Sequence, residues 1–405
     1  MEDGGGFGYH AGRVSLPEPR DDQRSQKTRL LRRVRRVVVK IGSNVLAGPS
    51  GLRRERIRAL AGEIAALVDG GRQVVVVSSG AVAAGAVRLG PRRTRIEWRQ
   101  AAAAVGQIGL MAAYERAFAA HERHVAQVLL THGDLADRRR YLNARHTLRT
   151  LLDLGIVPIV NENDTVAVEE LRFGDNDDLS ALTAALVEAD LLVILSDVDG
   201  VHTRDPRLAA DAAPVRVARA DDPALASAAG PAVTGVGTGG MASKLAAAQK
   251  AAAAGIPTTI ADGTRDGVLA AVFDAASECG TLLLAEGDAL ARRKHWIAYT
   301  LKPAGTLHLD AGAERALAKG GRSLLPSGVR GVEGSFGVGD CVRCVGPEGR
   351  EFARGLVNYT APEIDKIKGA HTREIETLLG YKGSDEVIHR DDLVLLGPTA
   401  PANRA

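Results

Sequence analysis

Short apolar runs that stop abruptly at a polar residue constrain the fold more than any other feature of this chain. They lie at residues 37–39, 74–77, 157–160 and 191–195, and a polar residue follows each of them directly. Such runs are typical of parallel strands buried on both faces, whose carboxyl ends meet at the edge where α/β proteins bind ligands. Stretches with helical periodicity alternate with these runs. The sequence therefore predicts an α/β fold, a three-layer α/β/α sandwich with a mostly parallel sheet.

The pattern of runs divides the chain into three parts. Residues 1–33 are rich in glycine, proline and charge, so we expect a disordered N-terminal extension. Residues 34–291 hold the alternating strands and helices and form the predicted catalytic domain. After residue 292 the pattern changes to short β-prone runs separated by glycine. This change predicts a small β-rich domain at residues 303–394.

Composition narrows the possible functions. The chain has 52 basic and 49 acidic residues, a near balance that argues against a protein that coats nucleic acid. No apolar run approaches the ~20 residues that span a bilayer, and the N-terminus lacks the apolar core of a signal peptide. The cysteines are Cys279, Cys341 and Cys344, a small and odd number that fits a reducing compartment. We therefore expect a cytoplasmic protein with no membrane partner.

Two clusters of carboxylates and amides stand close together in the sequence. The tetrapeptide NEND at 161–164 follows an apolar run directly, and GDNDDLS at 174–180 opens a predicted helix. One interpretation is a pair of Asx-rich turns with a helix N-cap. The other is a site that faces a ligand or a cation, because so many polar groups in one place are costly without one. The residues alone leave both interpretations open.

A glycine-rich loop precedes another predicted helix. Residues 235–240 read GVGTGG, but no apolar strand comes before them, so the context of a dinucleotide-binding loop is missing. Residues 238–244 (TGGMASK) combine main-chain amides, a helix N-terminus and Lys244, which together can hold phosphate groups. A flexible linker is the alternative. Lys40 follows the first apolar run directly. Two lysines, one at each end of a transferring phosphoryl group, would neutralise its charge, so the pattern favours phosphoryl transfer as the reaction.

Six motifs, taken in order and spacing, resemble the glutamate 5-kinase branch of the amino acid kinase family. They are KIGS at 40–43, SSGAVAAG at 78–85, NEND at 161–164, GDNDDLS at 174–180, the pairs SD at 196–197 and DP at 205–206, and GTGGMASK at 237–244. The C-terminal part resembles the PUA module, and the resemblance covers residues 34–394. Asp178 and Ser78 depart from the common pattern, in which asparagine and threonine stand there. The resemblance implies transfer of the γ-phosphoryl group of ATP to the γ-carboxylate of L-glutamate, the first step of proline biosynthesis.

The resemblance also implies roles for particular residues. It implies that Ser79, Asp164 and Asn176 hold glutamate. Lys40 and Lys244 are expected to neutralise the phosphoryl group, while Asp177 orients these lysines or a metal. Mg²⁺ is expected to arrive with ATP, and no metal-binding residue of the protein is predicted. The expected nucleotide contacts are Lys40, Ser196, Asp197, Thr238, Gly239, Gly240, Met241, Ala242, Ser243 and Lys244.

Two other functions remain open at this point. Relatives that share the fold phosphorylate N-acetylglutamate, aspartate or UMP, so the acceptor could differ. A protein of another class, an RNA-binding regulator, would use the C-terminal domain, where Arg322, Arg330, Arg343 and Lys366 form no dense basic stripe. The resemblance further implies a homo-oligomer and inhibition by proline.

Overall fold

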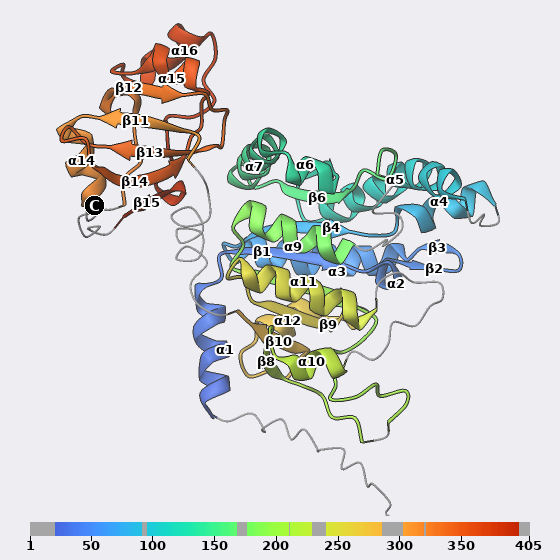
Figure 1. Cartoon of the computed structure of the whole chain (residues 1–405). Coiled ribbons are helices and arrows are strands. Elements are labelled where there is room, and N and C mark those ends of the chain that lie inside the picture. Colours follow the sequence, from blue (N-terminus) through green and yellow to red (C-terminus); the bar gives the residue numbers. More distant parts are fainter. Residues whose placement is uncertain are drawn as a thin grey trace, which may run out of the picture.

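The computed structural model describes residues 21–90, 95–167, 176–209, 211–228, 240–285, 303–319 and 321–396. Figure 1 shows two bodies, each built around its own β-sheet. An eight-stranded sheet in the order β5-β6-β4-β1-β7-β9-β10-β8 forms the larger body. A five-stranded sheet forms the smaller, C-terminal body.

Six neighbouring strands of the large sheet run parallel to one another. They are β5 (Val125–Leu130), β6 (Val157–Glu162), β4 (Gln73–Ser78), β1 (Arg36–Ile41), β7 (Leu191–Ser196) and β9 (Thr258–Asp262). At one edge, β10 (Thr281–Leu284) pairs antiparallel with β9, and β8 (Val217–Arg219) pairs parallel with β10. The predicted mostly parallel sheet is confirmed, with these two reversed strands as an addition.

Helices cover both faces of this sheet, because the side chains of each strand alternate between the faces. In β1, Val37, Val39 and Ile41 belong to one core, and Val38 belongs to the opposite core. The first core also contains side chains of α3 (Arg54–Asp69), α5 (Ile96–Ala119) and α12 (Val268–Phe273). The second contains side chains of α7 (Arg138–Asp153), α9 (Asn176–Val187) and α11 (Met241–Ala253). The three-layer sandwich is confirmed, and the alternation places Lys40 on the face of α9 and α11.

Two glycines bring α4 (Ala81–Leu89) and α5 into direct backbone contact. A Cβ atom on Gly85 would lie 1.8 Å from the carbonyl oxygen of Ala102, and one on Gly106 would lie 1.8 Å from that of Ala81. Any larger side chain at either position would therefore force the helices apart. Helix α4 starts just after β4, and α5 supplies polar side chains to the site. The close approach therefore fixes the position of α5 relative to the end of β4.

The sequence predicted a disordered extension over residues 1–33, and this prediction is wrong for its second part, because Asp21–Arg33 form helix α1. Residues 1–20 lie outside the described part of the chain. Leu31 is buried in the core beside α3, and Lys27 Nζ donates a hydrogen bond to the carbonyl oxygen of Ser277 at 2.5 Å. These long-range contacts stabilise a helix that a charge-rich composition did not predict.

The C-terminal body has a sheet and a core of its own. Its strands, in spatial order, are β12 (Val329–Gly334), β11 (Gly305–Leu309), β13 (Cys341–Val345), β14 (Glu351–Leu356) and β15 (Leu393–Leu395). Cys344 belongs to the main core of this domain, and Cys341 belongs to a second small cluster. The two cysteines therefore lie on opposite faces of β13 as small buried residues, which agrees with the β-rich domain predicted there.

One buried arginine joins the two bodies. Arg145 of α7 donates to Asp392 Oδ2 at 3.1 Å, in the short helix η3 (Arg390–Asp392), and to Glu188 Oε1 at 2.5 Å. Arg145 and Asp392 are each 2% exposed. Because Glu188 follows the last residue of α9, Arg145 connects the C-terminal domain to the end of α9 that points away from the carboxyl edge of the sheet.

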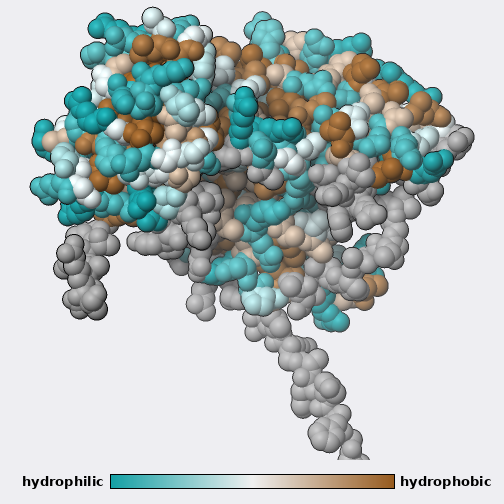
Figure 2. Space-filling view, turned by 45° about the horizontal axis from the view of Figure 1, so that its top comes forward, coloured by the Kyte–Doolittle hydropathy of each residue, from teal (hydrophilic) through white to brown (hydrophobic). Residues whose placement is uncertain are grey.

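The surface of the described residues mixes polar and apolar side chains. On the face shown in Figure 2, hydrophilic and hydrophobic residues are interspersed over both bodies. Within the described residues, no helix combines the length and the apolar character needed to cross a membrane.

Replacing Arg145 by Met removes the cation from the two carboxylates at the junction of the domains. Because breaking a buried ion pair costs about 3–5 kcal/mol, we expect a clear fall in the midpoint of thermal unfolding measured by calorimetry. The matched control is Arg204→Met, which removes an exposed pair with Asp211 and should cost less than about 1 kcal/mol. Equal midpoints for the two variants would contradict a stabilising role for the junction.

Candidate functional site

Two lysines and one aspartate form the centre of the candidate site. Lys40 Nζ, from the end of β1, donates to Oδ1 of Asp177, and Lys244 Nζ, from the first turn of α11, lies 3.3 Å from Oδ2 of the same carboxylate. Ser243 Oγ donates to that Oδ2 at 2.9 Å. Lys40, Lys244 and Asp177 are 2%, 4% and 0% exposed. The structure thus brings the three predicted catalytic residues into direct contact.

The electrostatics of this cluster suit an anion. Two ammonium groups and one carboxylate sum to a charge of +1, and burial strengthens the interaction of that charge with its neighbours. The cluster lies at the N-terminus of α11, where Gly240 is the N-cap and the helix dipole adds partial positive charge. The first main-chain amides of a helix have no acceptor within the helix. A phosphate group beside Lys244 would therefore find positive charge on two sides.

An amide network lies directly beside the lysines. Asn176 Nδ2 donates to the carbonyl oxygen of Ser78 at 2.7 Å, to Ser79 Oγ at 3.2 Å and to Asn161 Oδ1 at 2.9 Å. Asn161 Nδ2 in turn donates to Gln107 Oε1 at 2.8 Å. The network ties the ends of β4 and β6 to the first residue of α9. It places two of the predicted substrate residues, Ser79 and Asn176, in contact.

Asp164 lies three residues beyond Asn161 on the same loop. The burial of its carboxyl group, together with the nearby Glu162, raises the pKa of Asp164 to about 6, while Arg99 acts in the opposite direction. The described hydrogen bonds do not join Asp164 to Ser79 or Asn176. Its membership of the same pocket therefore stays a prediction.

Ser196 and Asp197 end β7 at the same edge of the sheet. Ser196 Oγ donates to Asp197 Oδ1 at 3.1 Å, and Asn44 Nδ2 donates to Asp197 Oδ2 at 2.8 Å. Partial burial opposes ionisation, but these hydrogen bonds and the nearby Lys244 hold the pKa of Asp197 below its usual range. Of the predicted phosphate contacts, Gly240 caps α11, and Met241, Ala242 and Ser243 form its first turn. Thr238 and Gly239 lie outside the described residues.

Several residues of the site were not predicted. Asn44 and Gln107 pair with predicted residues or their neighbours, and Tyr114 OH lies 2.9 Å from Ser78 Oγ. Gln107 and Tyr114 sit within a long helix, where no local pattern marks them. His132 lies two residues after the end of β5. The rule that polar residues just after a parallel strand lie near the site could have identified it, although it was not predicted.

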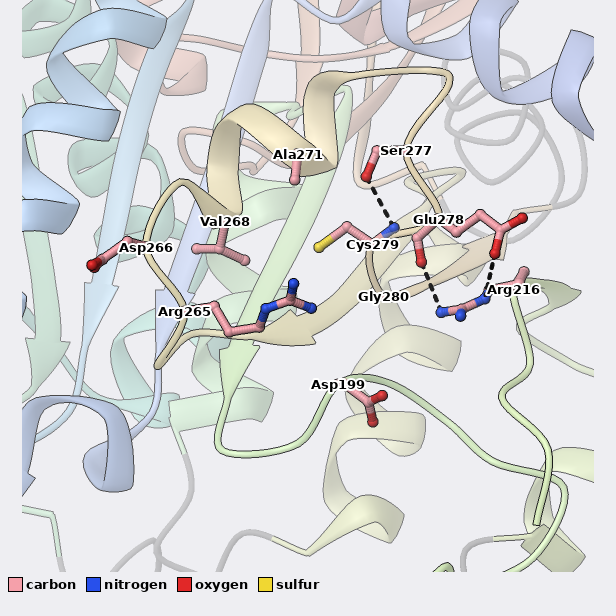
Figure 3. Close-up of a pocket in the computed structure, with 10 residues that line it drawn as sticks. All are labelled: Asp199, Arg216, Arg265, Asp266, Val268, Ala271, Ser277, Glu278, Cys279 and Gly280. Carbon is pink, nitrogen blue, oxygen red and sulfur yellow. Dashed lines mark hydrogen bonds and ion pairs between the residues drawn. The ribbon is translucent and has the colours of Figure 1, made fainter. Parts of the chain in front are cut away.

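A separate pocket of about 310 Å³ opens at the reversed strands (Figure 3). Figure 3 shows the thiol of Cys279 and the guanidinium of Arg265 within it, with Asp199 on the opposite wall and Arg216 paired with Glu278. None of the predicted site residues is among the ten that are drawn. One of its lining residues, Asp199, is two residues beyond Asp197 in the sequence, and the lining includes neither Lys40 nor Lys244.

The described residues do not form a metal site of their own. No group of three His, Cys, Asp or Glu side chains among them is placed to hold a metal ion. Both carboxylate oxygens of Asp177 are bonded to lysines, which makes this residue a poor metal ligand.

Comparison with known proteins gives consistent matches over both bodies. Residues 35–262 match the amino acid kinase family, and residues 305–379 match the PUA domain. A glutamate 5-kinase of Citrifermentans bemidjiense is 54% identical over 370 residues, covering 91% of this chain and 99% of the relative. Those of Geobacter sulfurreducens and Ectopseudomonas mendocina are 52% and 53% identical, covering 91% and 89% of this chain and 99% and 98% of the relatives.

Replacing Asp177 by Asn leaves two buried ammonium groups without their shared carboxylate. Because loss of one partner from a buried ion pair costs about 3–5 kcal/mol, we expect this variant to unfold at clearly lower temperature or denaturant concentration. Adding Lys40→Met to Asp177→Asn should restore part of the stability, since it removes one of the two buried ammonium groups that Asp177 contacts. A double variant whose stability loss is the sum of the two single losses would argue against direct coupling.

Proposed function

Since this chain belongs to the amino acid kinase family, we propose that it is a glutamate 5-kinase. The enzyme transfers the γ-phosphoryl group of ATP to the γ-carboxylate of L-glutamate and yields ADP and L-glutamyl 5-phosphate, the first step of proline biosynthesis. Relatives of that name match 99% of their own length at 52–54% identity, which supports this assignment over another acceptor.

The observation that carries the proposal is that two adjacent residues of α9 contact two different groups of side chains. Asp177 binds both buried lysines, and Asn176 reaches the hydroxyl of Ser79 and the amide of Asn161. An acceptor held by the amide network would meet a phosphate held by the lysines at the start of this helix. That is the arrangement a phosphoryl transfer between two bound substrates requires.

The chemical step needs charge neutralisation more than proton transfer. An oxygen of the γ-carboxylate attacks the γ-phosphorus, the bond from that phosphorus to the bridging oxygen breaks, and ADP leaves. The nucleophile is already ionised, so no general base is required. Its approach to an anionic phosphate is the obstacle, and Lys40 and Lys244 reduce the repulsion. Each should contribute about 3–4 kcal/mol to transition-state stabilisation, as preorganised charged donors do.

The nucleotide would lie along the end of β7 and the N-terminus of α11. Ser196 and Asp197 would contact it, with residues 238–244 around its phosphates. Mg²⁺ bound to the nucleotide would be held by phosphate oxygens and water rather than by a protein cage, and it would supply further charge neutralisation.

Further proposals concern the whole protein. We take residues 34–291 as the catalytic domain and 303–394 as the C-terminal domain, and the separate cores of the two bodies support this division. The sparse cysteines support a cytoplasmic location. We also propose a homo-oligomer that proline inhibits at or beside the glutamate site.

The test is ADP release by the purified full-length protein with ATP and Mg²⁺, using glutamate, N-acetylglutamate, aspartate and UMP in turn. We expect turnover with glutamate, a product that hydroxylamine traps as hydroxamate, and inhibition by proline. The Lys244→Met variant should lose about 10²–10³-fold in kcat, while Lys319→Met, an exposed lysine of the C-terminal domain, should not. Turnover with another acceptor and none with glutamate would overturn the assignment.

Asp164 predicts how glutamate binding depends on pH. With a pKa of about 6, its carboxylate is charged above that pH and can bind the substrate's ammonium group. The KM for glutamate should therefore rise as the pH falls through 6. In Asp164→Asn the KM for glutamate should be higher than in the wild type above pH 6 and should lack this acidic rise, so that the two values converge at lower pH, while the KM for ATP stays close to that of the wild type. Equal losses for both substrates would refute this assignment of Asp164.

A further inference from the structure

His132 lies where two segments of the proposed site meet. It is the first residue of α6 (His132–Ala136), a short helix after β5 whose N-terminus is held by a capping box. Its Nε2 lies 2.5 Å from Oδ2 of Asp178, in the first turn of α9. Its Nδ1 lies 3.9 Å from Oε1 of Glu162, the last residue of β6. One imidazole ring therefore spans two carboxylates that come from different elements.

These carboxylates adjoin the residues that would bind the acceptor. Asp178 follows Asn176 and Asp177 in α9, and Glu162 lies two residues before Asp164. The side chain of Glu162 is 11% exposed, and its Oε1 has no hydrogen-bond partner within the described residues. A carboxylate in such a position requires a compensating cation nearby. The ring of His132 provides one.

A second cation, on another element, also contacts this cluster. Lys250 of α11 pairs with Oδ1 of Asp178, on the side of the carboxylate away from the imidazole. The described contacts of Lys250 do not extend to Glu162. Among the charged groups of β6, α6, α9 and α11 that meet here, His132 is therefore the one whose described contacts include both Glu162 and Asp178.

We propose that His132 is a positioning residue for the phosphoryl acceptor. By bridging Glu162 and Asp178, it holds the loop after β6 and the N-terminus of α9 at the separation that glutamate binding needs. The inference rests on the proposed function, because it takes Asp164 and Asn176 as the glutamate contacts. Its described contacts do not include the two site lysines, so loss of the bridge should affect the acceptor and spare the nucleotide.

The charge of His132 sets the pH range of the bridge. The hydrogen bond to Asp178 and then the nearby carboxylate of Glu162 raise the pKa of His132 to about 9, although burial acts against this. The contribution of the bridge is therefore complete below the ordinary histidine value of about 6.5 and is lost as the pH rises through 9. Above that pH, Glu162 faces Asp178 without a cation between them.

The test is steady-state kinetics of the full-length protein with glutamate and ATP varied separately. We expect His132→Asn to raise the KM for glutamate about tenfold or more near neutral pH, since a small misplacement of a bound group is costly. The KM for ATP and kcat should change less than about twofold. His132→Arg keeps a cation that does not lose its proton, so it should restore the KM for glutamate. In the wild type we expect this KM to rise as the pH passes 9, and His132→Arg should abolish the part of the rise that comes from His132. Titration of the substrate's own ammonium group is common to all variants.

Lys250→Met is the matched control, because it removes a cation from Asp178 without touching Glu162. We expect it to leave the KM for glutamate within about twofold of wild type. If Lys250→Met raises this KM as much as His132→Asn, or if His132→Asn leaves it unchanged, the bridge has no positioning role. Should His132→Asn fail to fold, Glu162→Gln removes the other end of the bridge and is expected to give the same selective loss. A wild-type protein inactive on glutamate would instead overturn the proposed function.

Discussion

The carboxylate of Asp177 holds two positive charges that would otherwise repel each other in a buried position. Lys40 and Lys244 come from β1 and α11, elements about 200 residues apart in sequence, and a single residue of α9 brings them together. The parallel sheet makes this possible because it gathers the carboxyl ends of its strands at one edge. The alternation of side chains along β1 then turns Lys40 toward α9. A bound phosphate would add the negative charge that this arrangement accommodates.

Helix α9 is the element through which the rest of the site is organised. Its first three residues have different partners: Asn176 joins the amide network, Asp177 joins the lysines, and Asp178 joins His132 and Lys250. Its 12 residues span about 18 Å, and Glu188 at the far end pairs with the arginine that contacts the C-terminal domain. A rigid helix with both ends fixed in this way restricts the relative motion of the proposed acceptor and phosphate sides.

Local patterns in the sequence were enough to find the six parallel strands of the sheet, the longer helices that cover it and the two lysines. Apolar runs ending in a polar residue mark Lys40, Ser78, Asn161 and Ser196, and the glycine-rich helix start marks Lys244. Features that depend on contacts between distant segments were not visible. Helix α1 is stabilised by packing, β8 and β10 are short strands of the sheet edge, and Gln107 sits in an alanine-rich helix. The periodicity and spacing of the sequence do not show which distant segments these elements and residues contact in the folded protein.

The junction at Arg145 has a consequence for synthesis of the chain. Its partner Asp392 lies 247 residues later, and ribosomes add about 5–20 residues per second. The last strand of the catalytic domain, β10, ends at Leu284, so this domain can fold roughly 5–20 seconds before the carboxylate of Asp392 emerges. During this interval Arg145 and its surrounding surface are exposed to water and to other nascent chains. The C-terminal domain thus covers the surface around Arg145 once it has folded. In chains truncated before residue 392, that surface would stay exposed.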